Sequence, residues 1–137
     1  MKTLWIALCT ALLAVASASM STAQTSPGDM TVDVPFSFVV SRQTMPAGHY
    51  IVQTFDDAHV RIFSPGTTGL YVGTHAAVRS ASDGSKLVFH RYGDTYFLAA
   101  VWVAGNTTGR ELSLSRAERE LARNQTEVEL AEVRPRK

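Results

Sequence analysis

The sequence predicts an all-β fold with a short C-terminal helix: an antiparallel β-sandwich or small barrel of about seven or eight strands built from consecutive hairpins. Three observations support this fold class. Apolar and polar residues alternate through most of residues 30–104. Turn-forming residues interrupt the alternation at short intervals. Helical spacing of apolar residues appears only after residue 110.

The first 23 residues have the pattern of a secretory signal peptide. Lys2 supplies a positive start, residues 4–15 are almost entirely apolar, and Ser21 and Ala23 occupy the positions that a signal peptidase reads. An apolar run of about 12 residues is too short for a membrane span, which needs about 20. We therefore expect an exported protein, periplasmic or secreted, with no transmembrane anchor after cleavage.

The charge balance argues against nucleic-acid binding, and the cysteine content argues against disulfides. Loss of Lys2 with the signal leaves equal numbers of cationic and anionic side chains. This balance gives no basic surplus for nucleic-acid binding, so no nucleic-acid partner is expected. The only cysteine, Cys9, lies inside the signal, and the mature chain has no disulfide. Cleavage after Ala18 also fits the signal pattern, which leaves two candidate mature N-termini.

A single β-rich domain is expected over residues 30–133, between a short disordered leader at 24–29 and a frayed basic end at 134–137. Its first strand spans residues 30–40, with alternate residues sharing a buried face. Pro35 cannot donate a ladder hydrogen bond, which favours an edge strand or a bulge there.

Strands and turns then follow one another. Pro46 and Gly48 are expected to supply the fixed and the positive φ of a bend within residues 41–48. Gly93 is the first residue of a two-residue hairpin turn. The predicted order is a hairpin of 49–55 and 58–63 around Asp56-Asp57, a loop at 64–69, a strand at 70–79, a turn at 80–85, and a hairpin of 86–92 and 95–104 around Gly93-Asp94.

The C-terminal region changes character. Ser115 followed by Glu118 is a capping box and predicts a helix over residues 115–124. A helix this short is marginal alone, so its apolar stripe must dock on another element. That stripe consists of Leu114, Ala117 and Leu121. Residues 126–133 return to alternation and are interpreted as a last strand, with extension of the helix as the alternative.

The turn lengths predict which residues face each other across strands. A two-residue turn pairs Tyr92 with Thr95 and places His90 opposite Phe97. A six-residue turn at 80–85 pairs Arg79 with Lys86 and places His75 opposite His90. The predicted core face carries Val72, Ala76, Val78, Leu87, Phe89, Leu98, Ala100 and Trp102. The other face carries His75, Val88, His90, Tyr92, Phe97, Ala99, Val101 and Val103.

The second face is too apolar to lie bare in water. The helix or a second sheet covers it in one interpretation, and a partner protein covers it in the other. In the latter case the binding surface is the apolar row Val88, Phe97, Val101 and Val103, with His75, His90 and Tyr92 beside it. An open sheet edge near Pro35 that accepts another strand is a further candidate.

Few residues suggest chemistry. His75 and His90 as cross-strand neighbours would place two imidazoles about 5 Å apart, a weak candidate metal site. A zinc site needs at least three protein ligands, and no third one falls nearby, so we expect no metal and no cofactor. Asp56, Asp57 and His59 are interpreted as solvated turn residues. No hydrolase or nucleotide-binding motif is present, so an enzyme is not expected and a hydrolase is a remote alternative.

Three blocks of sequence resemble a group of small exported bacterial proteins of unassigned function. The blocks are Val34–Phe38, Met45–Tyr50 and Leu87–Asp94, and they match the patterns V-P-F-x-F-x-V, L-P-A-G-x-Y and V-F-H-R-Y-G-D-x-Y-F-L. A charged segment like residues 115–120 follows in that group, and Met45 stands where Leu is usual. The resemblance covers most of residues 32–123 and implies export and a single β-rich domain, without an activity.

Within the third block, Arg91 is expected on the core side near the end of the sheet. Its guanidinium should bind a strand-end carbonyl or a carboxylate, with Asp94 and Asp33 as candidates. The leading functional hypothesis is an exported non-enzymatic β-domain that acts in the cell envelope or outside the cell by protein binding or self-assembly. The alternative is a small-ligand or metal-binding protein that uses His75 and His90.

Overall fold

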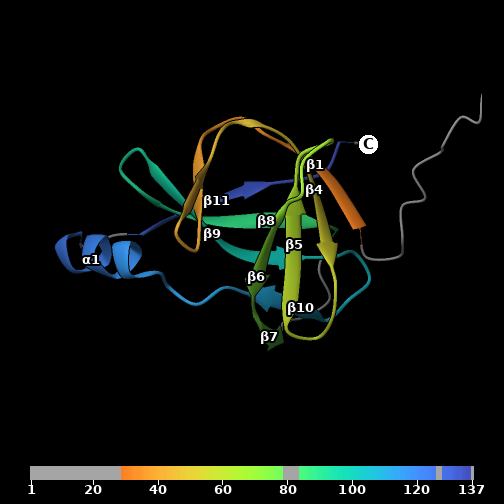
Figure 1. The fold of residues 1–137 in the computed structure, drawn as a ribbon. Coiled ribbons are helices and arrows are strands. Elements are labelled where there is room, and N and C mark those ends of the chain that lie inside the picture. Colours follow the sequence, from red (N-terminus) through yellow and green to blue (C-terminus); the bar gives the residue numbers. More distant parts are fainter. Residues whose placement is uncertain (1–28, 79–83, 126–127, 137) are drawn as a thin grey trace, which may run out of the picture.

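Two β-sheets enclose the hydrophobic core in the computed structural model, which describes residues 29–78, 84–125 and 128–136 (Figure 1). Sheet A contains β1 (Asp29–Val34), β4 (Gly48–Thr54), β5 (His59–Phe63) and β6 (Leu70–Gly73) in the order β1-β4-β5-β6. Sheet B contains β11 (Glu129–Val133), β8 (Lys86–Tyr92), β9 (Thr95–Trp102), β10 (Thr108–Glu111) and β7 (His75–Val78) in the order β11-β8-β9-β10-β7. A short hairpin of β2 (Phe38–Val40) and β3 (Gln43–Met45) joins sheet B, with β2 parallel to β9. Helix α1 (Arg116–Asn124) lies at one end of the molecule.

The predicted fold class is confirmed. The described residues form eleven strands in two mainly antiparallel sheets and one short helix, a sandwich rather than a closed barrel. The strands outnumber the expectation because two predicted strands each divide and because β3 and β10 form in segments where no strand was predicted. The strand expected at 30–40 breaks after Val34 into β1 and β2, and β1 is an edge strand, as Pro35 predicted. The strand expected at 70–79 breaks at Thr74, where the chain leaves sheet A as β6 and enters sheet B as β7.

The hairpin turns are partly as predicted. Tyr92 pairs with Thr95 and His90 with Phe97, and Gly93 has a φ of 61°, which confirms the second hairpin. In the first hairpin, a turn made of Asp56 and Asp57 alone would pair Thr54 with His59, but Thr54 pairs with Val60, so the predicted two-residue turn is wrong. The loop is longer because the Asp56 carboxylate accepts a hydrogen bond from the Ala58 N–H at 2.7 Å and forms a local turn.

A β-bulge in sheet B changes the predicted faces. Val88 pairs with Ala100 but Phe89 pairs with Leu98, so one extra residue is inserted in β9. Beyond the bulge the side chains of β9 point to the opposite face from the one predicted. Val101 therefore packs in the core between the sheets, whereas Ala100 and Trp102 pack with Val88 on the outer face. The expected core positions of Ala100 and Trp102, and the outer position of Val101, are wrong.

The predicted neighbours of β7 are also wrong. β7 pairs with β10 at the edge of sheet B, and His75 lies opposite Glu111. β8 pairs with β11 and β9, and His90 lies opposite Leu130 and Phe97. The expected pairing of His75 with His90 is therefore not formed, because β9 and β10 lie between their strands. At this edge Val78, expected in the core, is 80% exposed, and Ala76 is exposed as well.

The C-terminal elements follow the prediction closely. Ser115 is the N-cap of α1, and its Oγ accepts a hydrogen bond from the Glu118 N–H at 3.1 Å. β11 confirms the last strand in place of a longer helix. The expected fraying of the end is wrong for Arg136, whose guanidinium lies 3.0 Å from the Asp33 carboxylate on β1.

The predicted signal peptide, both cleavage sites and Cys9 lie outside the described residues. β1 begins at Asp29, which the prediction had assigned to the leader. The turn expected at 80–85 is described only from residue 84. Within the described ranges, α1 is too short and too polar to cross a membrane.

Candidate functional site

The apolar row predicted as a binding surface is covered by the protein itself. Val88 and Phe97 are buried, Val101 is 1% exposed in the core between the sheets, and Val103 is half-buried. Burial of these side chains within the chain satisfies the hydrophobic effect without a partner. The row as a whole is therefore not available as a docking surface, and of its four members only Phe97 lines a groove, the one beside α1.

Helix α1 lies against part of this outer face and is attached to it by a polar contact. The Glu118 side chain is buried, and its Oε1 lies 2.6 Å from the Nδ1 of His90 on β8. The Tyr92 hydroxyl donates to the same oxygen at 3.4 Å. Burial, together with the negative charge of Glu118, raises the pKa of Tyr92. The spacing of Ser115 and Glu118 predicts a capping box, and it does not show that the Glu118 side chain contacts His90 and Tyr92.

His75 and His90 do not form a metal site. His75 Nε2 lies 3.8 Å from the Glu111 carboxylate, and His90 is bonded to Glu118 beneath α1. In residues 29–78, 84–125 and 128–136 there is no group of three or more His, Cys, Asp or Glu side chains that could hold a metal ion.

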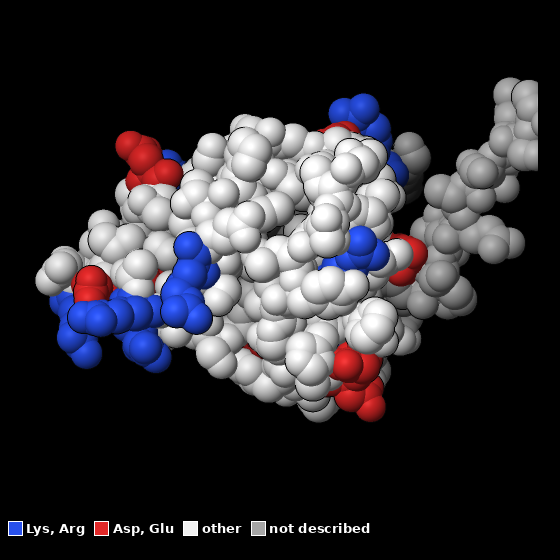
Figure 2. All heavy atoms as spheres, viewed as in Figure 1, with Lys and Arg blue, Asp and Glu red and all other residues white. Residues whose placement is uncertain are grey.

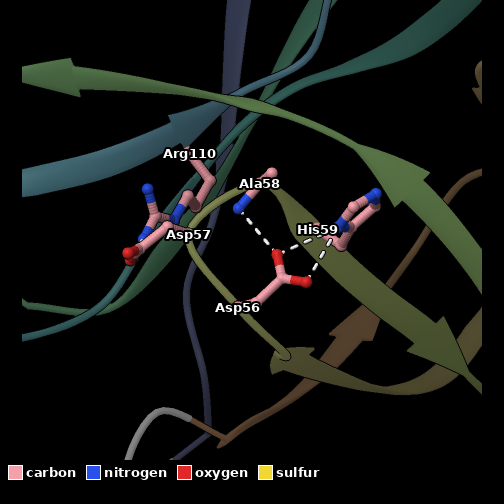
Figure 3. Close-up of polar contacts among 5 residues, drawn as sticks. All are labelled: Asp56, Asp57, Ala58, His59 and Arg110. Atoms are coloured by element: carbon pink, nitrogen blue, oxygen red, sulfur yellow. Dashed lines mark hydrogen bonds and ion pairs between the residues drawn. The ribbon is translucent and has the colours of Figure 1, made fainter.

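The acidic hairpin tip between β4 and β5 has a structural role (Figure 3). The Asp56 carboxylate accepts hydrogen bonds from the Ala58 N–H and from the His59 ring, and these bonds lower the pKa of Asp56. Asp57 points the other way, toward Arg110 of β10, with 3.0 Å between carboxylate and guanidinium. The tip of sheet A is thereby joined to sheet B, and the predicted role as turn residues fits this geometry.

Arg91 confirms one expectation and corrects another. Its Nε donates to the carbonyl of Gly93 at 2.8 Å, as a strand-end carbonyl was predicted. Its carboxylate partner is Glu129 of β11 at 3.2 Å, so the candidates Asp94 and Asp33 are wrong. Sequence spacing could not show this pair, because it depends on β11 lying beside β8.

The bend before β4 is built differently from the prediction. The carbonyl of Pro46 accepts a hydrogen bond from the Tyr50 hydroxyl at 2.6 Å, which holds the segment against the core. Gly48 begins β4 without a positive φ, so that expectation is wrong. The left-handed residue is Ser41, at φ 58°, in the turn between β2 and β3.

An open strand edge offers the clearest accessible binding feature. No other described strand pairs with the outer side of β6. The Thr74 N–H donates to the Ala58 carbonyl at 2.6 Å, which makes this a hydrogen-bonded pair of the antiparallel ladder. Bonded pairs alternate with non-bonded ones, so Val72 also bonds to β5, whereas Tyr71 and Gly73 turn their N–H and C=O groups outward.

Aromatic side chains and a fixed arginine accompany this edge. Tyr71 is 54% exposed and Phe55 is 68% exposed, and their rings meet edge to face at 5.9 Å. The Arg61 guanidinium lies 4.3 Å from the ring centre of Phe63 and 5.6 Å from that of Tyr71. Its Nη2 donates to the Thr68 carbonyl at 2.8 Å. The loop leading into β6 is thereby held in place.

Two hollows separate the β6 edge from β3, the free strand of the β2–β3 hairpin. One hollow has a volume of about 280 Å³, and the other, which reaches Tyr71, has about 600 Å³. The apolar part of the first lining comes from both sheets: Met45, Tyr50, Ile62, Phe63 and Leu70. The second is lined mostly by polar residues of the β2–β3 hairpin, together with Val40, Leu70 and Tyr71. The β6 edge therefore combines free backbone groups with space for apolar side chains next to it.

Comparison with known proteins gives no relative for this chain. No family model matches it, and neither the curated proteins nor the solved structures include a significant match.

Proposed function

We propose that this protein is an exported, non-enzymatic binding domain that acts in the cell envelope or outside the cell by binding an extended segment of another protein. The segment adds as a strand to the open edge of β6. The outward N–H and C=O groups of Tyr71 and Gly73 carry this proposal. Unpaired backbone groups at a sheet edge are a template for a further strand.

The surroundings of the edge indicate the chemistry of the bound segment. In a strand, alternate side chains point to opposite faces. One set would enter the hollows between β6 and β3, and the other would lie beside the exposed Tyr71 and Phe55 rings. We therefore expect an extended segment with apolar residues at alternate positions on at least one side.

β6 is a better acceptor than the edge near Pro35. The open side of β1 faces the C-terminal segment, where Arg136 pairs with Asp33. β6, in contrast, is held by the Arg61–Thr68 contacts and has no comparable cover among the described residues. An edge that is already ordered loses less conformational entropy on binding.

A pair of substitutions at one position tests the proposal. A Cβ at Gly73 would meet no atom within 4 Å, and Gly73 does not have a positive φ, so Gly73→Ala should leave the fold and binding unchanged. Gly73→Pro removes the outward N–H without removing a bond to β5, because that N–H points away from β5. For extended peptides selected from a displayed random library, we expect affinity to fall about tenfold or more in Gly73→Pro alone.

Amide hydrogen exchange supplies an independent readout in the unmodified protein. A selected peptide should slow exchange of the Tyr71 and Gly73 amides, which point to solvent in the free protein. Equal affinities of the two variants, or protection confined to α1, would overturn strand addition at β6. Concentration-dependent dimerisation that protects the same two amides would identify a second copy of this chain as the donor of the strand.

A further inference from the structure

A second groove lies at the other side of the β2–β3 hairpin from the β6 edge, although Ser41, Arg42 and Thr44 of the hairpin also line the hollow that reaches Tyr71. The second groove runs between this hairpin and α1 and has a volume of about 850 Å³, within the range of sites that hold one small molecule. Val39 of β2, Phe97 of β9, and Ala117 and Leu121 of α1 give it apolar walls. None of these side chains takes part in the proposed strand addition.

The groove exists because of the way in which α1 is attached. The helix contacts sheet B through Glu118, which bonds His90 and Tyr92. Ala117 and Leu121, the residues expected to dock, line the groove instead of closing it. The apolar stripe of the helix is therefore available to a ligand.

The charged side chains that line this groove are two arginines and one glutamate, Glu120. Arg42, in the turn between β2 and β3, and Arg116, in the first turn of α1, both line it. Arg116 pairs with Glu120 at 3.2 Å, a contact that is weak because both side chains are exposed. Arg42 makes no ion pair with any described residue, and Figure 2 shows Lys and Arg atoms gathered at the end of the molecule that carries α1. The charge of the whole chain is balanced, but this end is locally cationic.

We propose that the groove binds a free single-chain amphiphile with an anionic head group, such as a medium-chain carboxylate. The alkyl chain would lie along Val39, Phe97 and Leu121, and the head group would lie at the guanidinium of Arg42. An alkyl chain matches the apolar walls, and an anionic head matches the one lining arginine without an ion pair. A volume of about 850 Å³ has room for one such chain.

Isothermal titration with dodecanoate, at a pH where its carboxyl group is ionised, tests this assignment. We expect one site per chain and an affinity that rises about two- to fourfold for each methylene from octanoate to dodecanoate. Leu121→Gln removes an apolar wall and Arg42→Gln removes the cation, and each should weaken binding by about fivefold or more. Dodecyltrimethylammonium, with the same chain and a cationic head, should bind at least about tenfold more weakly.

Arg123→Gln is the matched control, because it removes one cation from α1 at a residue that does not line the groove. Its affinity should stay within about twofold of the unmodified protein. In the unmodified protein, nuclear Overhauser contacts should join the alkyl chain to the Phe97 ring. Equal losses in Arg42→Gln and Arg123→Gln, full affinity in Leu121→Gln, or binding to anionic vesicles without binding of free dodecanoate would overturn the proposal.

Discussion

The Nδ1 of His90 lies 2.6 Å from the Oε1 of Glu118, and this contact joins α1 to sheet B. The Glu118 carboxylate also accepts from Tyr92, and it does not return to the N–H of Ser115 as a complete capping box would. A buried carboxylate thus replaces apolar packing as the main attachment of a short helix. The open groove beside Leu121 is a consequence of this arrangement.

Removing this carboxylate should release α1. We expect Glu118→Ala to lower the free energy of unfolding by about 1.5–3 kcal/mol, because hydrogen bonds to a charged group are lost at a buried position. Urea denaturation measures this change, and hydrogen exchange of the α1 amides shows whether the helix is affected.

Glu120→Ala is the control on the same helix. Glu120 is exposed and pairs with Arg116, so its loss should change stability by no more than about 0.5 kcal/mol. Similar losses in the two variants would show that the His90–Glu118 contact is not what holds α1 in place, because alanine is the better helix former at both positions.

The β2–β3 hairpin and the His90–Glu118 contact could not be predicted from this sequence. Alternation and turn residues predicted most strands, and Ser115 predicted the helix, because these are local signals. The partner of Glu118 depends on which strand α1 reaches, and no local pattern encodes that. The same spacing of Ser115 and Glu118 is compatible with a complete capping box and with a tertiary contact.

Acid should weaken the fold through Asp33. Hydrogen bonding to His49 at 2.6 Å and the charge of Arg136 lower the pKa of Asp33 in the folded protein. The unfolded chain then binds more protons than the folded one at low pH, so the stabilisation is present above about pH 4 and is lost as pH falls through the folded pKa. The melting temperature should fall less steeply between pH 5 and pH 2 in Asp33→Asn than in the unmodified protein.

The two causes can be separated by titrating the Asp33 carboxyl by NMR. His49→Ala and Arg136→Ala should both raise the pKa of Asp33, and the histidine variant should raise it more, because the hydrogen bond is the larger cause. A larger shift in Arg136→Ala would contradict this order and would make Arg136 the main partner of the Asp33 carboxylate.

The bulge in β9 explains why strand positions were predicted better than strand faces. A period of two assigns faces only while each residue opposes one partner. The extra residue at Ala99 breaks this rule, and nothing in the run Leu98 to Trp102 signals it, because every residue there is apolar. The accessible site was missed for a different reason: β6 and β3 become open edges through pairings between distant strands.

The outer cluster around Trp102 depends on a glycine. A Cβ at Gly109 would lie 2.7 Å from the indole ring, whereas a Cβ at Gly48 would lie 3.9 Å from its nearest neighbour. Neither glycine has a positive φ, so the substitutions differ mainly in steric contact. We expect Gly109→Ala to lower the free energy of unfolding by about 1–3 kcal/mol and Gly48→Ala to change it by less than about 0.5 kcal/mol. Equal effects in urea denaturation would contradict close packing of β10 on Trp102.

The shape of the β6 edge depends on Gly69, at the end of the preceding loop. Its φ is +85°, and a Cβ there would lie 2.7 Å from the Cβ of Phe63 and 3.1 Å from the carbonyl of Ile62. Gly69→Ala therefore combines an unfavourable backbone conformation with a clash against atoms of β5 that cannot move freely. We expect a loss of about 2–4 kcal/mol in the free energy of unfolding, measured by urea denaturation.

Gly66→Ala separates the two contributions. Gly66 lies in the same loop with a φ of +82°, but a Cβ there would meet nothing within 4 Å, so only the backbone term of about 1 kcal/mol should appear. The difference between the variants then measures how closely the loop approaches β5 next to the proposed acceptor edge. If both alanines had the same effect, the loop would be free to move away from Phe63. The β6 edge would then not be preorganised for a partner strand.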